Sequence, residues 1–232
     1  MENERVVETS TPFSIPVPYS HVETGTPGEK PVIVYLHGYK QNMQYFQKKM
    51  KKLRQIRAHH IYLQGPYPVF DEKQKRAVEE WGRAWYLYDG NQQTFIHHLE
   101  KTASFVEHFL RDDVLPTIDY SRLALMGYSM GGYLAGYFAL SRMPMVDDVA
   151  VLGARIKVEL FADQSFDGLN VFALHGSNDT SVHAEPQQKS CQQLSAQGAK
   201  VHYQSIAVAH KLSDSYIQTA RKWFIGAGYE VN

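Results

Sequence analysis

Residues 122–132 read Arg-Leu-Ala-Leu-Met-Gly-Tyr-Ser-Met-Gly-Gly, and this stretch decides the fold class of the chain. Its first half is an apolar run typical of a strand, and the Ala- and Gly-rich residues after it favour a helix. Gly127 and Gly131 stand two residues on either side of Ser129, where the chain passes too close for side chains. Such a turn exposes the serine hydroxyl at the carboxyl end of the strand and directs free helix N–H groups at a developing oxyanion. The stretch therefore predicts Ser129 as a nucleophile.

Strands and helices alternate on both sides of this turn. Strand-like runs occur at 31–38, 60–65, 122–127, 148–153, 169–176 and 201–208. Helical patterns occur at 43–57, 94–114, 130–142, 186–197 and 213–224, with Ser213 as a plausible N-cap of the last. Alternation of this kind predicts an α/β fold with a mostly parallel central sheet and helices on both faces.

The length of 232 residues suits a single α/β domain over 1–232. Residues 1–30 are expected to form N-terminal edge strands and turns, because prolines are frequent from residue 9 onward. Residues 66–91 form a long stretch rich in Gly, Pro and aromatic residues, which predicts a long loop over the active site.

The charges balance, with 24 Lys and Arg against 24 Asp and Glu, so no charge excess favours nucleic acid. The basic residues of 48–57 alternate with apolar ones and predict a solvated helix face. No apolar run approaches the length of a membrane span, so no stable membrane insertion is expected. The single Cys191 and the lack of a signal-peptide pattern in residues 1–10 favour a cytoplasmic protein. Eleven histidines occur without a zinc-like spacing, so neither a metal nor a cofactor is expected.

A serine hydroxyl needs a base, and in this kind of fold the order along the chain is serine, acid, histidine. Asp179 follows the strand at 169–176, and His210 follows the strand at 201–208. His210 is expected to take the Ser129 proton while Asp179 orients its ring. The weaker candidates by position are the acids Asp163, Asp167 and Asp214 and the bases His175, His183 and His202.

The oxyanion of an acyl-transfer intermediate needs two hydrogen-bond donors. The residue after the nucleophile supplies one, which is the N–H of Met130. The loop after the first buried strand supplies the other. Gly38 permits a turn there, and the N–H of Tyr39 is the expected donor.

Taken together, these motifs resemble the phospholipase/carboxylesterase family, from about residue 31 to residue 224. The resemblance rests on Leu36-His37-Gly38, Trp85-Tyr86, the Ser129 turn, His175-Gly-Ser-Asn-Asp179 and His210. It implies the α/β-hydrolase fold, a monomer or homodimer, and cleavage of carboxylic esters or thioesters through an acyl-enzyme without a metal or cofactor. The chain departs from the family pattern at Lys40, Met130 and Ala209, where family members often have Gly, Gln and Gly.

The resemblance implies a serine carboxylesterase that hydrolyses small to medium acyl esters, with a small-molecule ester as its partner. A thioesterase or lysophospholipase with the same triad is the alternative enzyme, and a hydrolase fold retained as a non-catalytic binding module is the third interpretation. Trp85 and Tyr86 are interpreted as walls of the substrate pocket, against the alternative that they pack the loop onto the core.

Overall fold

The computed structural model describes residues 9–11, 14–73 and 75–232. The sequence expectations for residues 1–8, 12 and 13 lie outside the described residues. They include most of the residues on which the absence of a signal peptide was predicted, and some of the residues predicted to form N-terminal turns. Residue 74 of the long loop also lies outside them.

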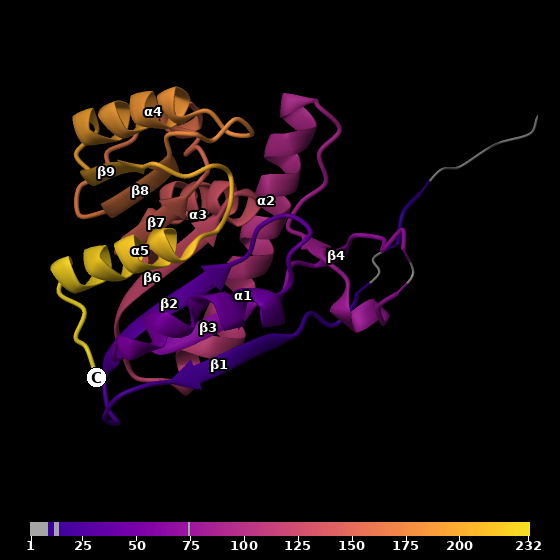
Figure 1. Cartoon of the computed structure of the whole chain (residues 1–232), viewed down its shortest axis with the longest axis horizontal. Coiled ribbons are helices and arrows are strands. Elements are labelled where there is room, and N and C mark those ends of the chain that lie inside the picture. Colours follow the sequence, from indigo (N-terminus) through magenta and orange to yellow (C-terminus); the bar gives the residue numbers. More distant parts are fainter. Residues whose placement is uncertain (1–8, 12–13, 74) are drawn as a thin grey trace, which may run out of the picture.

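A seven-stranded sheet in the order β1-β3-β2-β6-β7-β8-β9 forms the centre of the molecule (Figure 1). Its strands are β1 (Tyr19–Glu23), β2 (Lys30–Leu36), β3 (His59–Leu63), β6 (Tyr120–Tyr128), β7 (Asp148–Leu152), β8 (Asn170–Gly176) and β9 (Lys200–Ile206). Only the edge strand β1 runs antiparallel to its neighbour, β3, and every other pairing in this sheet is parallel. The predicted mostly parallel sheet is confirmed.

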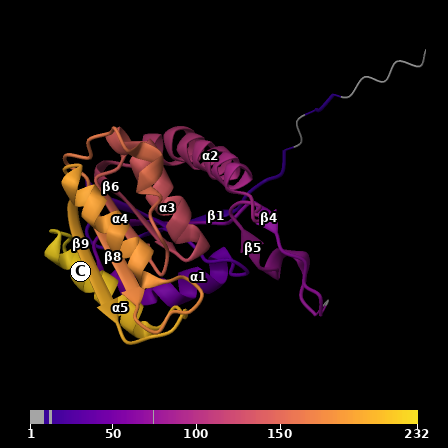
Figure 2. The same cartoon turned by 90° about the horizontal axis from the view of Figure 1, so that it is seen from above.

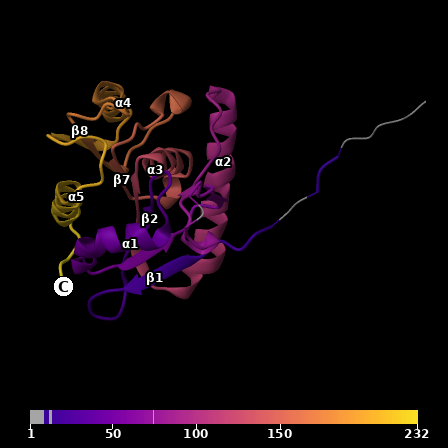
Figure 3. The ribbon, with the colours of Figure 1, turned by 45° about the vertical axis from the view of Figure 1, so that its right-hand side comes forward.

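Five α-helices cover the two faces of this sheet (Figure 2). They are α1 (Met43–Lys49), α2 (Gln92–His108), α3 (Met130–Ser141), α4 (Ala184–Ala196) and α5 (Asp214–Gly226). Residues of α1 and α5 pack into one buried cluster, and residues of α2, α3 and α4 pack into the other. Helices on both faces were predicted, and Figure 3 shows α2 and α5 on opposite flanks.

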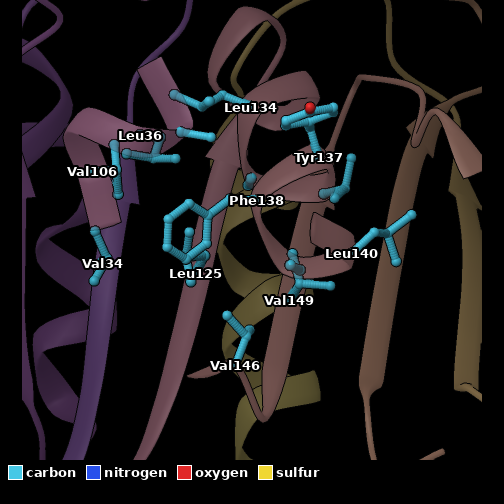
Figure 4. Packing of buried hydrophobic residues seen from close by; sticks show 14 of the residues in the cluster. Val34, Leu36, Val106, Leu125, Leu134, Tyr137, Phe138, Leu140, Val146 and Val149 are labelled. Atoms are coloured by element: carbon cyan, nitrogen blue, oxygen red, sulfur yellow. The ribbon is translucent and has the colours of Figure 1, made fainter. Parts of the chain in front are cut away.

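The two clusters exist because successive side chains of a strand point to opposite faces. In β2, Val32 and Val34 join the cluster of α2, α3 and α4, whereas Ile33 and Tyr35 join the cluster of α1 and α5. Figure 4 shows Val34 and other members of the first cluster packed beneath α3. Helix α3 is buried over nearly its whole length, because its residues are apolar or small on every side.

The continuous helix predicted at 43–57 is wrong in its second half. The α-helix ends at Lys49, and a 3₁₀ helix follows over Met50–Gln55. Met50, Leu53 and Ile56 are all fully buried and stand three residues apart. A 3₁₀ helix has three residues per turn, so a spacing of three places Met50 and Leu53 on the same side of it, and Ile56 follows its last residue.

Other boundaries differ by a few residues. Helix α2 begins at Gln92 because Asn91 accepts hydrogen bonds from the N–H groups of residues 93 and 94. The predicted helix at 94–114 continues beyond α2 as a π-helical segment over Phe109–Val114. Several short 3₁₀ turns occur elsewhere in the chain. These turns span Leu115–Thr117, Met143–Met145 and Val158–Phe161. Ser213 caps α5 as predicted.

The segment 66–91, called the excursion below, contains a second, two-stranded sheet. Strand β4 (Tyr67–Pro68) pairs antiparallel with β5 (Arg83–Ala84), and a 3₁₀ turn spans Val78–Glu80. Figures 1 and 2 show this hairpin standing out from the main body of the molecule. The described part of the excursion is therefore less irregular than its composition predicts.

None of the helices in the described part of the chain combines the length and the apolar character that a membrane crossing requires.

Candidate active site

Ser129 occupies a strained turn between β6 and α3. Its backbone has φ 51° and ψ −117°, which side chains rarely adopt, and its N–H donates to the Leu152 carbonyl at 2.8 Å. Glycine is required on both sides. A Cβ at Gly127 would collide with the carbonyl of Gly131, and a Cβ at Gly131 would stand 2.5 Å from the carbonyl oxygen of His37. The turn therefore holds the serine hydroxyl above the carboxyl end of the sheet.

The side chains of Ser129, His210 and Asp179 form one hydrogen-bonded relay. Ser129 Oγ lies 2.9 Å from His210 Nε2, and His210 Nδ1 lies 2.6 Å from Asp179 Oδ2. The buried carboxylate fixes the ring with Nδ1 protonated, which leaves Nε2 free to accept the serine proton. The His210 ring also stacks on Tyr128, with the ring centroids 5.5 Å apart.

The second oxygen of Asp179 is fixed by the backbone. Asp179 Oδ1 accepts hydrogen bonds from the N–H groups of Ser181 and Val182 at 2.9 and 2.8 Å. Burial alone would raise the pKa of Asp179, but the hydrogen bonds from Val182 and His210 outweigh it and hold the pKa below its usual value. The carboxylate therefore stays ionised beside the imidazole, where it can stabilise an imidazolium.

The topology explains why residues 50 and 81 positions away from Ser129 meet it. Strands β6, β7 and β8 are parallel neighbours, and β9 follows β8, so their carboxyl ends share one edge. Asp179 follows β8, and His210 follows β9. Two of the competing candidates have other partners: Asp214 pairs with Lys52, and His175 Nε2 lies 2.7 Å from the Val182 carbonyl, closer than its 3.8 Å to Asp179.

Residues 37–42, called the oxyanion loop below, approach the Ser129 turn from β2. The Gly38 N–H donates to the side-chain oxygen of Gln41 at 2.9 Å. Lys40 has φ 60°, and its N–H donates to the Arg83 carbonyl at 3.1 Å. The Arg83 N–H in turn donates to the Gln41 carbonyl at 2.7 Å. Arg83, at the base of the excursion, thus fixes the left-handed backbone conformation of Lys40. Tyr39 lies directly before this fixed residue.

His37 anchors the start of the oxyanion loop from below. Its ring is fully buried, Nε2 accepts from the Gly65 N–H at 2.9 Å, and Nδ1 lies 2.9 Å from the Gly38 carbonyl. These partners require a neutral ring with the proton on Nδ1. Burial, the largest influence, lowers the pKa of His37 to about 4. His37 therefore acts as a neutral structural link between the oxyanion loop and the end of β3.

We expect acid to destabilise the protein partly through His37. An unfolded histidine has a pKa of about 6.5, so between pH 6.5 and 4 the unfolded chain binds a proton that the folded site excludes. The free energy of unfolding should therefore fall by up to about 1.4 kcal/mol per pH unit from this group as the pH drops through that window. Urea titrations of the wild type and of His37→Gln at several pH values measure the slope.

The slope between pH 6.5 and 4 should be smaller in His37→Gln than in the wild type. His108→Gln, at an exposed position of α2, is the control and should keep the wild-type slope. An identical pH dependence in wild type and His37→Gln would contradict the assignment.

The two aromatic residues predicted as pocket walls have different surroundings. Trp85 is fully buried, its indole N–H donates to the His37 carbonyl at 2.7 Å, and its own carbonyl accepts from Thr102 at 2.6 Å. It therefore packs beneath the oxyanion loop. Tyr86 faces a cavity of about 200 Å³. The cavity is lined by Tyr86, Tyr88, Gln92, Phe95, Tyr133 and Lys157.

Most residues of this lining carry no recognisable signal in the sequence. Phe95 falls within the predicted helix at 94–114 without any sign of a site, and no motif marks Lys157. Tyr133 could have been found, because it stands one helical turn after Ser129.

No group of three or more His, Cys, Asp or Glu side chains is arranged to hold a metal ion within the part of the chain that the structure describes. Cys191 is buried in α4, and this burial raises the pKa of its thiol to about 12, so the thiol is a poor nucleophile.

Comparisons with known proteins identify the family and the fold of this chain. The family model described as Phospholipase/Carboxylesterase matches residues 17–225. No curated protein sequence matches the chain. Among solved structures, a Bacillus cereus carboxylesterase is 15% identical with a TM-score of 0.70, covering 91% of this chain and 94% of that one. Zea mays acyl-protein thioesterase 2 is 17% identical with a TM-score of 0.71, covering 90% and 98%. Esterase PE8 is 15% identical with a TM-score of 0.77, covering 91% and 99%. At these identities the solved structures show a shared fold.

Proposed function

Because this chain belongs to the phospholipase/carboxylesterase family, we propose that it is a serine carboxylesterase that hydrolyses small to medium acyl esters through an acyl-enzyme. The observation that carries the proposal is the relay from Ser129 Oγ to His210 Nε2 and from His210 Nδ1 to Asp179 Oδ2, at 2.9 and 2.6 Å. The α/β-hydrolase fold supports it, since the relay lies where reactive loops meet at the carboxyl ends of the strands.

In the proposed acylation step, Ser129 Oγ attacks the ester carbonyl while His210 Nε2 takes its proton. The tetrahedral intermediate collapses when the imidazolium gives that proton to the leaving alcohol. Water then repeats the sequence on the acyl-enzyme and releases the carboxylic acid. Asp179 stays ionised and stabilises the imidazolium in both halves.

The proposed oxyanion donors are the N–H groups of Met130 and Tyr39. Met130 is the first residue of α3, so its N–H has no acceptor within the helix and faces the site together with the helix dipole. Tyr39 lies between Gly38 and Lys40, whose N–H groups are held by Gln41 and Arg83. Since both neighbours of Tyr39 are fixed, its own N–H is held in place before the substrate arrives, which is the condition for effective oxyanion stabilisation.

The cavity beside Tyr86 is the proposed acyl pocket. Ligand pockets for drug-sized molecules commonly measure about 300–1,000 Å³. A cavity of about 200 Å³ favours a small acyl group over the long chain of a lysophospholipid. Tyr86 is retained as a proposed substrate contact, and Trp85 is proposed to support the site from beneath.

The first test is labelling with a fluorophosphonate probe, which reacts with activated serines. The wild type should label, whereas Ser129→Ala and His210→Ala should not. If the folded wild-type protein is not labelled by the probe, the esterase proposal is wrong and the non-catalytic binding module is favoured.

A series of acyl esters then separates the two enzymatic alternatives. Among p-nitrophenyl esters from acetate to palmitate, kcat/KM should be highest for the shorter chains. A thioesterase or lysophospholipase would instead prefer long chains or acyl-CoA. The predicted cytoplasmic location and the monomer or homodimer stay predictions.

A further inference from the structure

The acyl pocket has a polar end that ester hydrolysis itself does not require. The pocket lies beside the Ser129 turn, because Tyr133, which lines it, stands one helical turn after Ser129, and the hydroxyl of Tyr86 donates to the Met130 carbonyl at 3.5 Å. At another side of the same cavity lies the ammonium group of Lys157. An acyl group that extends from Ser129 into this cavity would therefore meet a cation.

The body of the pocket is aromatic. Phe95 is almost fully buried, and three tyrosine rings meet it edge to face. The centroid distances to Phe95 are 5.1 Å for Tyr86, 5.5 Å for Tyr88 and 6.1 Å for Tyr133. An apolar cavity of about 150 Å³ is known to accommodate benzene, so about 200 Å³ suits an apolar body of similar or slightly larger size.

Lys157 is held in place by weak partners. Its Nζ lies 3.2 Å from the Gln92 side-chain oxygen, 3.5 Å from the Glu159 carboxylate and 5.7 Å from the Phe95 ring centroid. Only 16% of the side chain is exposed to solvent. An ammonium group has three donors, and a contact of 3.5 Å to a carboxylate is long for a charge-assisted hydrogen bond. The ammonium can therefore take a better acceptor.

The charged side chains at this end of the pocket carry a net positive charge, which favours binding of an anion. The Glu159 carboxylate is shared, since Arg155 pairs with it at 2.9 Å, closer than Lys157 does. The three side chains together carry one net positive charge beside an aromatic, partly enclosed cavity. A carboxylate at the far end of a bound acyl group would balance it.

We propose that the acyl pocket selects half-esters of dicarboxylic acids, with Lys157 as the residue that determines specificity for the free carboxylate. The proposal rests on the proposed esterase function and names the substrate class for the same site. The ester carbonyl lies at Ser129, the apolar stem lies among the aromatic rings, and the carboxylate pairs with the ammonium of Lys157.

The test compares matched esters in one protein. The mono-p-nitrophenyl esters of adipic, pimelic and suberic acids are paired with p-nitrophenyl hexanoate, heptanoate and octanoate, which have the same carbon numbers but no charge. The wild type should hydrolyse the best half-ester with a kcat/KM about tenfold above that of its neutral partner, because the charged pair forms in a partly desolvated site. Rates in buffer alone are subtracted.

Lys157→Met keeps an unbranched apolar stem and removes the charge. The ratio of kcat/KM for half-ester over neutral ester should fall at least about tenfold in this variant. Lys189→Met is the matched control, because Lys189 is exposed on α4 and pairs with Glu185 away from the pocket. Its ratio should equal that of the wild type. A ratio within one variant is independent of how much of the protein is folded.

The outcomes separate this inference from the proposed function. No hydrolysis of either ester by the wild type would overturn the esterase proposal and this inference with it. Hydrolysis without a preference for the half-ester, or a preference that survives in Lys157→Met, would overturn the inference alone.

Discussion

Ser129→Ala is expected to lower kcat for ester hydrolysis by at least about 10⁴-fold, because the variant has no nucleophile and retains only binding and the oxyanion donors. His210→Ala should lose a similar factor, since the Ser129 hydroxyl then has no base at 2.9 Å. Asp179→Asn should also lose about 10⁴-fold, because an amide at this position favours the wrong tautomer of His210. Steady-state rates on p-nitrophenyl butyrate measure all three.

Two controls distinguish loss of the relay from general damage. The double variant Ser129→Ala/His210→Ala should be no slower than the worse single variant, since residues that act as one unit are not additive. His108→Ala, at an exposed position of α2, should keep the wild-type rate. Ser129→Ala should melt close to the wild type, because it loses one part-buried hydrogen bond worth about 1 kcal/mol. A Ser129→Ala protein with even one-tenth of the wild-type kcat would refute the mechanism.

Gly131→Ala is expected to destabilise the protein strongly, because the added methyl group would meet backbone atoms of a neighbouring strand. The new Cβ would stand 2.5 Å from the His37 carbonyl oxygen and closer still to that of Leu36. Both are backbone atoms of β2 and its end, which cannot rotate aside as a side chain can. We expect a loss of about 3 kcal/mol or more in the free energy of unfolding. For a chain of this size that is a fall of roughly 6–12 °C in Tm.

Gly226→Ala is the matched control, because a Cβ at that position meets no atom within 4 Å. Its stability should be unchanged or slightly higher, since alanine favours a helix over glycine. Scanning calorimetry of the two variants gives the comparison. Equal melting temperatures for Gly131→Ala and the wild type would show that β2 and α3 approach each other less closely than described.

The convergence of Ser129, His210 and Asp179 could be predicted because each is marked by a local sequence signal and the sheet topology brings the three together. Adjacent residues identify the turn around Ser129, and Asp179 and His210 each follow a recognisable buried strand. In a parallel sheet, all such positions lie at one edge. The sheet could be predicted for the same reason, since strands buried on both faces read as continuous apolar runs.

What could not be predicted depends on contacts between distant backbone atoms. The pairing of Lys40 and Gln41 with Arg83 uses only N–H and carbonyl groups, which every residue has, so the sequence contains no trace of it. The 3₁₀ helix after Lys49 was missed because a three-residue spacing also fits an α-helix over two turns. The position of Lys157 in the acyl pocket depends on how a loop after β7 packs against α2, which no local pattern fixes.

Because the oxyanion loop is attached to the excursion, the proposed catalytic arrangement should be less stable than the fold as a whole. The loop that carries one proposed oxyanion donor is joined to Arg83 by two backbone hydrogen bonds, and Arg83 belongs to a two-stranded ribbon with few buried side chains. Small ribbons of this kind open locally at a lower free-energy cost than a seven-stranded sheet. Each opening would release Tyr39 while Ser129, His210 and the two cores stay intact. A fraction of the molecules would then be folded but inactive. The equilibrium between open and closed ribbon, rather than the stability of the sheet, would determine the fraction of active molecules.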